Sequence, residues 1–176
     1  MKRYTMHKMN PHAALVQVII IMLVVFSLSC SDNRQSSVAP ESGKGGITDF
    51  TLIDLDGKKF TLSEQQGKPV LIIFSTTWCP TCRSEIPHYK KIHETYADQG
   101  LVIINIDILE SQDKVSRFAG KYQLPYRVLL DETGGVAEAY RVAGVPAMIL
   151  IDQSGALISR QYEEIDDLLK ILLKGS

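Results

Sequence analysis

Two of the three cysteines of this chain stand three positions apart, in the segment Cys79-Pro80-Thr81-Cys82. Two sulfurs at this spacing on the first turn of a helix face the same way and can bond to each other. The first sulfur would lie at the helix N-terminus, where unpaired N–H groups and the helix dipole favour a thiolate. The pair is therefore suited to making and breaking disulfides, provided that the surrounding elements place it at a helix start.

The flanking sequence supplies such elements. A continuous apolar run, Val70–Phe74, ends just before the motif, and such runs suit strands that are buried on both faces of a sheet. The motif then opens a helical pattern, in which residues recur at spacings of three and four: Cys82, Ile86, Tyr89, His93 and Tyr96. A strand, the cysteine pair and a helix in this order form the context that a redox motif requires.

The remaining elements indicate a mixed α/β fold. Two β-prone runs, residues 50–55 and 58–62, flank Asp56-Gly57 and predict a hairpin. Further strands are expected at Leu101–Ile104, Val128–Leu130, Ala147–Ile151 and near Ala156–Ser159, and further helices at residues 115–122 and 165–172, with a short one between them. This order predicts a mixed central sheet with helices on both faces.

Length and charge limit the class of protein. The chain has 176 residues, 45% hydrophobic and 22% charged, which suits one domain with a real core. Its formal net charge is -1; without the early cations Lys2, Arg3 and Lys8, 16 basic and 20 acidic residues leave about -4. A mildly acidic domain gives no electrostatic footprint for nucleic acid. No dinucleotide, Walker, heme or nicotinamide signal occurs, so no cofactor is expected.

The first 29 residues predict a targeting segment. The three early cations precede Ala13–Leu28, a 16-residue apolar stretch with two polar interruptions. As a helix it would span roughly 24 Å, slightly less than a hydrocarbon core of about 30 Å. A basic start, an apolar centre and small residues after it describe a secretory signal. Residues 1–29 are therefore assigned to a signal peptide or membrane anchor.

The third cysteine, Cys30, lies at the end of this segment. Ser27-Leu28-Ser29-Cys30 resembles a bacterial lipobox, whose cysteine is lipidated, although Ser27 stands where that pattern usually has Leu. An uncleaved signal anchor and a cleaved soluble protein are the alternatives to lipid at Cys30. Residues 30–46 are rich in Ser, Gly and Pro and predict a flexible linker of roughly 20–24 Å. Residues 47–176 would then form a domain outside the cytoplasm, facing the periplasm.

The cysteine motif and its surroundings resemble thioredoxin. The likeness rests on Trp78 before the first cysteine, on Pro87 five residues after the second, and on Val145-Pro146 before a late strand. The closer similarity is to the TlpA/ResA-like branch of extracytoplasmic thioredoxins, over roughly residues 47–176. The local stretches that carry it are Asp54-Leu55-Asp56-Gly57-Lys58, Cys82-Arg83-Ser84-Glu85-Ile86-Pro87, Gly144-Val145-Pro146-Ala147 and Ile149-Leu150-Ile151-Asp152. The resemblance implies a thioredoxin fold with an N-terminal β-hairpin and an extra βα element, at Ser111–Tyr122 and Val128–Leu130.

The resemblance also implies roles for the residues of the motif. Cys79 would be the exposed nucleophile that attacks a substrate disulfide, and Cys82 the more buried cysteine that resolves the mixed disulfide. The peptide bond between Val145 and Pro146 would be cis; a proline at the start of a strand is the alternative. The substrate groove would be lined by Trp78, Pro80, Thr81, Val145 and Pro146.

Glu85 is the candidate for proton handling. It follows Cys82 by three residues, so the two share a helix face. In the family the matching acid sits near the cysteines, where it could take the proton from the resolving thiol. Ordinary thioredoxins carry a buried Asp six residues before the first cysteine, but Ile73 stands there in this chain. The alternative for Glu85 is a solvated helix glutamate.

Other polar and aromatic residues carry more ordinary expectations. Acids near strand ends are expected to be solvated, and Trp78 to pack at the active site. His88 and His93 are expected at the surface or along a groove, and Tyr126 and Tyr140 in the core or a groove. The acids concerned are Asp107, Asp113, Asp131 and Glu132.

The direction of electron flow is open. The two residues between the cysteines tune the reduction potential, over about 150 mV or ~7 kcal/mol between thioredoxin and a strong oxidant of the DsbA type. Thr81 replaces the proline usual in its slot, and a proline at the position of Pro80 also occurs in the oxidant motif. Disulfide reduction is expected, with a dithiol oxidant of the same fold as the alternative.

Other protein classes fit less well. One CxxC motif supplies only two zinc ligands, and no second pair follows, so no metal is expected. A Sco-like copper chaperone resembles a CxxxC pair with a distant downstream His, whereas this chain has no His after His93. A peroxiredoxin needs its peroxidatic cysteine in a different local pattern. A non-catalytic binding module is disfavoured because both cysteines and Trp78 are retained.

The resemblance finally implies partners. The substrates would be disulfide-bearing proteins, such as the CxxCH pairs of apocytochrome c during cytochrome c biogenesis, or other secreted thiol proteins. The electrons would come from an integral-membrane donor of the CcdA/DsbD kind, which the membrane tether would keep within reach.

Overall fold

The strand that leads into the cysteine motif, β3 (Val70–Ser75), is buried along its whole length. Leu71 and Ile73 pack into one core cluster, and Ile72 and Phe74 into another. Side chains alternate between the two faces of a strand, so both faces of the sheet must be covered here. The computed structural model describes residues 47–173, and the predictions for residues 1–46 lie outside that range.

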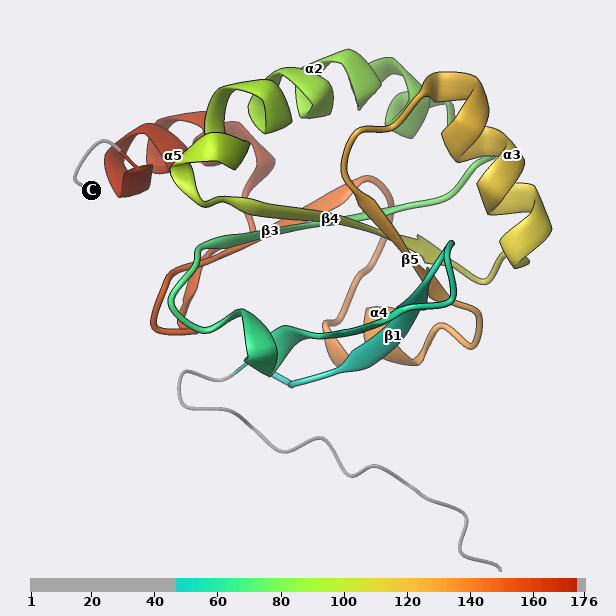
Figure 1. The fold of residues 1–176 in the computed structure, drawn as a ribbon, viewed down its shortest axis with the longest axis horizontal. Helices are drawn as coiled ribbons and strands as arrows, with labels where there is room; N and C mark the ends of the chain where they lie inside the picture. Colours follow the sequence, from blue (N-terminus) through green and yellow to red (C-terminus); the bar gives the residue numbers. More distant parts are fainter. Residues whose placement is uncertain (1–46, 174–176) are drawn as a thin grey trace, which may run out of the picture. The chain divides into compact units, whose positions relative to one another are not determined.

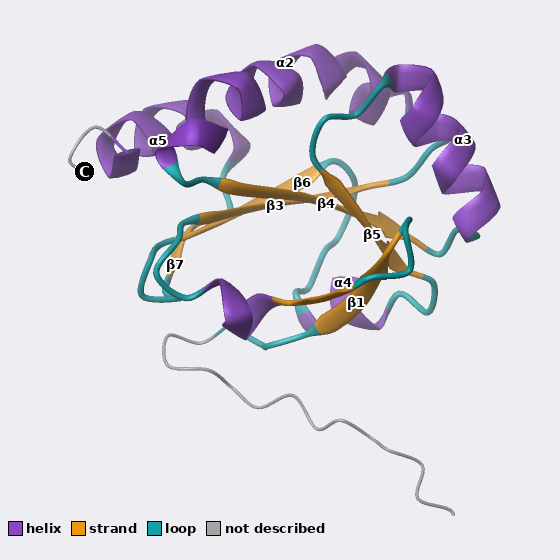
Figure 2. Ribbon diagram, in the orientation of Figure 1, coloured by secondary structure: helices purple, strands orange, loops and turns teal. Residues whose placement is uncertain are grey.

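The sheet has seven strands, in the order β2-β1-β5-β4-β3-β6-β7 (Figure 2). Neighbours β3, β4 and β5 run parallel, and the other four pairings are antiparallel. The strands are β1 (Thr51–Asp54), β2 (Lys59–Thr61), β4 (Val102–Ile108), β5 (Arg127–Asp131), β6 (Ala147–Ile151) and β7 (Leu157–Ser159). The predicted mixed sheet is therefore confirmed.

Helices cover both faces of this sheet, as the sequence indicated. Figure 1 shows α2 and α5 on one face, with α3 beside them, and α4 on the other. The α-helices are α2 (Pro80–Tyr96), α3 (Gln112–Tyr122), α4 (Gly135–Ala139) and α5 (Ile165–Leu173). Short 3-10 helices are η1 (Leu62–Gln65), η2 (Ala97–Gln99) and η3 (Tyr162–Glu164). The architecture is that of a thioredoxin fold.

The N-terminal hairpin and the extra βα element are both present. Strands β1 and β2 pair antiparallel around Gly57, whose φ of +77° suits glycine at the turn. The hairpin joins the sheet through β1 and β5, and Arg127 of β5 donates a 2.7 Å bond to buried Asp54 of β1. The element α3–β5 inserts β5 between β1 and β4.

The clearest difference from the sequence prediction is the length of β4. The apolar run predicted a strand at Leu101–Ile104, but β4 continues to Ile108 through Asn105 and Asp107. Both polar residues are buried because β4 lies between β3 and β5. The strand therefore carries polar side chains to the end of the sheet that holds the cysteines.

Among residues 47–173, no helix combines the length and the apolar character needed to cross a membrane.

Candidate active site

Cys79 is the N-cap residue of α2, and its sulfur accepts a 3.1 Å hydrogen bond from the backbone nitrogen of Cys82. Pro80 occupies the first helical position, where a missing N–H group costs nothing because that group would have no partner in the helix. The partial positive charge of the helix N-terminus thus faces the sulfur of Cys79. The structure brings the two cysteines together as reduced thiols.

Both cysteines are buried, with 4% of Cys79 and 3% of Cys82 exposed. The expectation of an exposed Cys79 is wrong for this conformation. Its sulfur donates a 3.6 Å hydrogen bond to the carbonyl of Val145, which belongs to the loop before β6. The Val145-Pro146 peptide bond is cis, as the resemblance implied.

The two thiols differ in their surroundings. Burial, together with the hydrogen bond to Cys79, raises the pKa of Cys82 to about 12. Cys82 therefore holds its proton at neutral pH, and a base must remove that proton before Cys82 can act as a nucleophile.

Trp78, which was expected to pack at the active site, is largely exposed beside Cys79. Its neighbours Thr76, Thr77 and Cys79 are buried, while 62% of Trp78 is exposed. The inward-facing residues on either side leave the indole in solvent. A large exposed aromatic beside the nucleophile is a suitable contact for an incoming protein.

Glu85 is held by side chains that the sequence reading did not pair with it. Its carboxylate accepts a hydrogen bond from the Tyr162 hydroxyl, and it lies 3.5 Å from Nδ1 of His88. His88 in turn contacts Asp166 through Nε2 at 3.0 Å. Glu85 is thus partly buried and not freely solvated. Within residues 47–173 it makes no hydrogen bond to either cysteine, so its role in proton transfer remains a prediction.

Two of the acids expected in solvent are buried. Asp107 and Asp131 are each 1% exposed, whereas Asp113 and Glu132 are exposed as expected. Asp131 accepts a 2.8 Å bond from the backbone nitrogen of Ala137 and so caps α4. Both acids are buried because they stand on inner strands of the sheet, Asp107 on β4 and Asp131 on β5.

Glu110 is a residue that sequence reasoning missed. It is buried, and its two carboxylate oxygens accept bonds from Thr77, from the backbone nitrogen at 2.5 Å and from Oγ1 at 2.7 Å. Lys114, four residues on, forms an ion pair with it. The spacing of Glu110 and Lys114 was visible in the sequence. Thr77 lies 33 positions away, and only the fold brings it to Glu110.

Asp107 and Glu110 have opposite protonation preferences. Burial raises the pKa of Asp107, and its hydrogen bond to Glu110 and the charge of Glu110 raise it further, to about 9. Burial also acts against ionised Glu110, but hydrogen bonds with Asp107, Lys114 and Thr77 lower its pKa to about 2. At neutral pH the proton therefore resides on Asp107 and the negative charge on Glu110.

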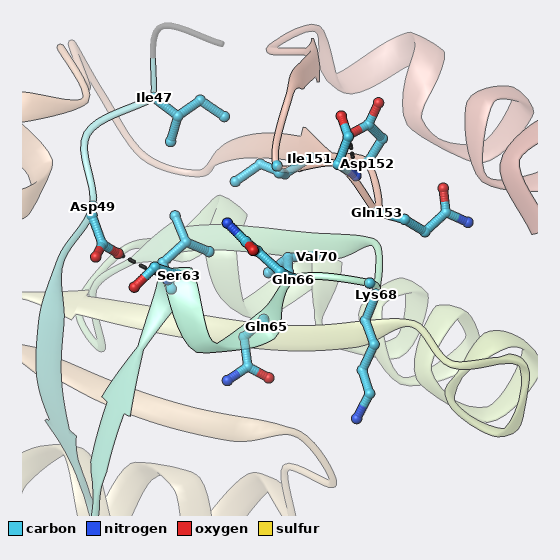
Figure 3. A pocket seen from close by; sticks show the side chains of 14 residues that line it. Ile47, Asp49, Ser63, Gln65, Gln66, Lys68, Val70, Ile151, Asp152 and Gln153 are labelled. Carbon is cyan, nitrogen blue, oxygen red and sulfur yellow. Dashed lines mark hydrogen bonds between the residues drawn. The ribbon is translucent and has the colours of Figure 1, made fainter. Parts of the chain in front are cut away.

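A cavity of about 470 Å³ lies at the other end of the sheet (Figure 3). It is bordered by Val70 and Ile151, which pair with each other at the start of β3, whereas Phe74 pairs with Ala147 near the cysteines. Phe74 lies four positions after Val70, which is roughly 13 Å along a strand. The cavity is thus separate from the thiols. Within the described range, 47–173, no three His, Cys, Asp or Glu side chains are grouped so as to hold a metal.

Comparisons with known proteins agree with this geometry. Residues 45–160 match the AhpC/TSA family. The thiol-disulfide oxidoreductase ResA of Bacillus thuringiensis subsp. konkukian is 32% identical over 169 residues, which cover 92% of this chain and 98% of that protein.

Solved structures are similar as well. A thiol:disulfide interchange protein of the thioredoxin family from Chlorobium tepidum has a TM-score of 0.62 and 28% identity, covering 71% of this chain and 93% of that chain. A secreted Mycobacterium tuberculosis disulfide oxidoreductase homologous to E. coli DsbE has a TM-score of 0.62 and 25% identity, covering 70% and 96%.

The fold and the buried CxxC pair define a thiol–disulfide oxidoreductase of the thioredoxin fold. The chain belongs to the AhpC/TSA family, and it is of the ResA/DsbE type.

Proposed function

We propose that Cys79 and Cys82 reduce disulfides in proteins outside the cytoplasm. The observation that best supports this proposal is the different surroundings of the two cysteines. The sulfur of Cys79 lies at the helix N-terminus, while Cys82 keeps its proton. In the first step the Cys79 thiolate attacks a substrate disulfide. A bond forms between Cys79 and one substrate sulfur, and the other substrate sulfur leaves and takes up a proton.

In the second step Cys82 loses its proton and attacks the sulfur of Cys79. The mixed disulfide breaks, the Cys79–Cys82 disulfide forms, and the second substrate sulfur leaves as a thiol. Two electrons have then moved from the dithiol of the chain to the substrate. The proposed acceptor of the Cys82 proton is Glu85, three residues away on the same helix and partly buried against Tyr162.

The proposed substrate groove consists of residues at the surface of this pair. Trp78, Pro80 and Thr81 are exposed, and Val145 and Pro146 are half-buried on the loop that covers Cys79. A substrate chain bound there would lie next to the Val145 carbonyl, which accepts the hydrogen bond of the Cys79 thiol in this structure.

The proposed place of action is the outer face of a membrane. Residues 1–29 would act as signal peptide or anchor, Cys30 as the lipidation candidate, and residues 30–46 as a linker to the domain at 47–176. The secreted relative from M. tuberculosis supports an extracytoplasmic site. Proposed substrates include apocytochrome c CxxCH pairs, and the proposed electron donor is an integral-membrane protein of the CcdA/DsbD kind.

The test is a trap for the mixed disulfide. Cys82→Ser removes the resolving sulfur, so a substrate attacked by Cys79 should stay covalently bound and be released by dithiothreitol. Cys79→Ser is the matched control and should capture nothing. Equal capture by the two variants, or capture by neither, would contradict the proposed roles. The identity of the captured proteins tests the proposed cytochrome c substrates.

A further inference from the structure

The loop that carries the nucleophile is tied to β4 by a buried carboxylate. Only Thr76, Thr77 and Trp78 separate the end of β3 from Cys79. Within this loop Thr77 gives both its backbone N–H and its hydroxyl to Glu110, at 2.5 and 2.7 Å. Two charge-assisted bonds to one residue fix the position of that residue closely. The helix start at Cys79 lies two residues further on.

A second buried carboxyl group, that of Asp107, lies near Glu110 and has an oxygen without a hydrogen-bond partner among residues 47–173. Asp107 is 1% exposed, and this oxygen is its Oδ1. In the sheet Asp107 is aligned with Ser75, the last residue of β3. Two carboxylates buried side by side cannot both ionise easily, so one of them retains a proton.

The charges around the pair determine which group ionises. Lys114 of α3 forms an ion pair with Glu110 and also acts on Asp107. Asp131 of β5, aligned with Ile108 next to this corner, is occupied by the backbone of α4. The cation and the bonds from Thr77 both favour the charge on Glu110 and leave the proton with Asp107.

The backbone between the two acids has an unusual conformation. Leu109 has a φ of +58° and is 67% exposed, although a leucine in the left-handed region is strained. Its nitrogen donates a 2.9 Å bond to the carbonyl of Asp131. Such a conformation persists only where the surroundings hold it, and it is often found at functional sites. Here it forms the turn that lets Glu110 reach Thr77.

We propose that Glu110 is a positioning residue for the redox centre: it holds the loop at Thr77 and thereby the sulfur of Cys79 at the N-terminus of α2. The inference rests on the proposed roles of Cys79 and Cys82. No chemical step passes through the pair.

The test compares Glu110→Gln with Glu132→Gln, an exposed glutamate outside the pair. The amide of Gln carries no charge, and its NH2 group cannot accept a bond as the second carboxylate oxygen of Glu110 does, so both bonds from Thr77 lose their charge assistance. We expect Glu110→Gln to slow disulfide exchange about tenfold, the effect of losing a charge-assisted bond. The same variant should shift the pH profile of Cys79 alkylation and the reduction potential of the cysteine pair. Glu132→Gln should match the wild type.

A rate, pH profile and potential of Glu110→Gln equal to those of Glu132→Gln would overturn the inference. If Glu110→Gln does not fold, Thr77→Val takes its place, because it removes only the hydroxyl bond; an unchanged pH profile in Thr77→Val would likewise overturn it. Failure of the underlying function is distinguishable, since the wild type would then show no exchange that Cys79→Ser abolishes.

Discussion

The sulfur of Cys79 lies 3.1 Å from the backbone nitrogen of Cys82 and accepts its hydrogen bond. The same helix therefore stabilises one sulfur at its N-terminus and buries the other one turn later. This difference assigns the two cysteines different roles, in which Cys79 attacks the substrate and Cys82 resolves the mixed disulfide.

The first prediction concerns selective alkylation. At pH 7 to 8, iodoacetamide should modify Cys79 and spare Cys82, because burial raises the pKa of Cys82 to about 12 and keeps it protonated. Peptide mass spectrometry after short exposure would measure both sites. Cys79→Ser provides the control, since Cys82 should remain unmodified in it. Equal labelling of the two cysteines in the wild type would refute the asymmetry.

The second prediction concerns Glu85. Glu85→Gln should shift the pH dependence of both thiol reactions and leave the fold intact, because the amide can no longer accept the proton of Cys82. Glu94→Gln is a matched control, exposed on the same helix. Thiol titrations that are identical in the two variants would rule out a proton-handling role for Glu85.

The third prediction concerns Trp78. Trp78→Ala should lower kcat/KM for a protein disulfide by about tenfold, since aromatic anchors commonly contribute this much at interfaces. The rate with a small aromatic disulfide should change much less. Ile171→Ala, an exposed residue at 73% on α5, is the control. A parallel loss with both substrates would mean that Trp78 supports the site itself and does not contact the partner.

The fourth prediction concerns stability and pH. The folded-state pKa of Asp107, about 9, lies above its unfolded value, so its contribution is complete below about pH 4 and is lost as the pH rises toward 9. Glu110 acts in the opposite sense, and its contribution is lost as the pH falls from its ordinary range toward 2. Of these two acids, only Asp107 changes the free energy of unfolding between about pH 5 and 8.

Asp107→Asn should therefore flatten the decline in the free energy of unfolding between pH 5 and 8. The difference from the wild type can reach about 1.4 kcal/mol per pH unit. Denaturant titrations at several pH values would measure it, with exposed Asp113→Asn as the control. A slope equal to that of the wild type would show that Asp107 is ionised in the folded protein.

Much of the fold could be predicted because its signals are local. The apolar run of β3, the turn at Gly57 and the spacing along α2 each lie within a few residues. Burial of polar residues is not local. Asp107 is covered because β3 and β5 flank it, so its apparent place at a strand end was misleading.

The sequence predicted the two cysteines of the site, but it did not predict the distant residues that contact the cysteines and their loop. The CxxC motif and the cis bond before Pro146 follow from short patterns and the resemblance. The burial of Cys79 depends on Val145, 66 positions away, and the hold on Thr77 depends on Glu110, 33 positions away. Contacts at such separations exist only once the chain is folded.

The reduction potential of the Cys79–Cys82 pair tests the central claim most directly. The purified chain would be equilibrated with defined dithiothreitol or glutathione ratios, and the fraction of disulfide measured. The account predicts a value near or below that of thioredoxin, about -270 mV, as a reductase requires. A value near -120 mV, roughly that of DsbA, would contradict it and indicate a dithiol oxidant whose Pro80-Thr81 pair stabilises the reduced form.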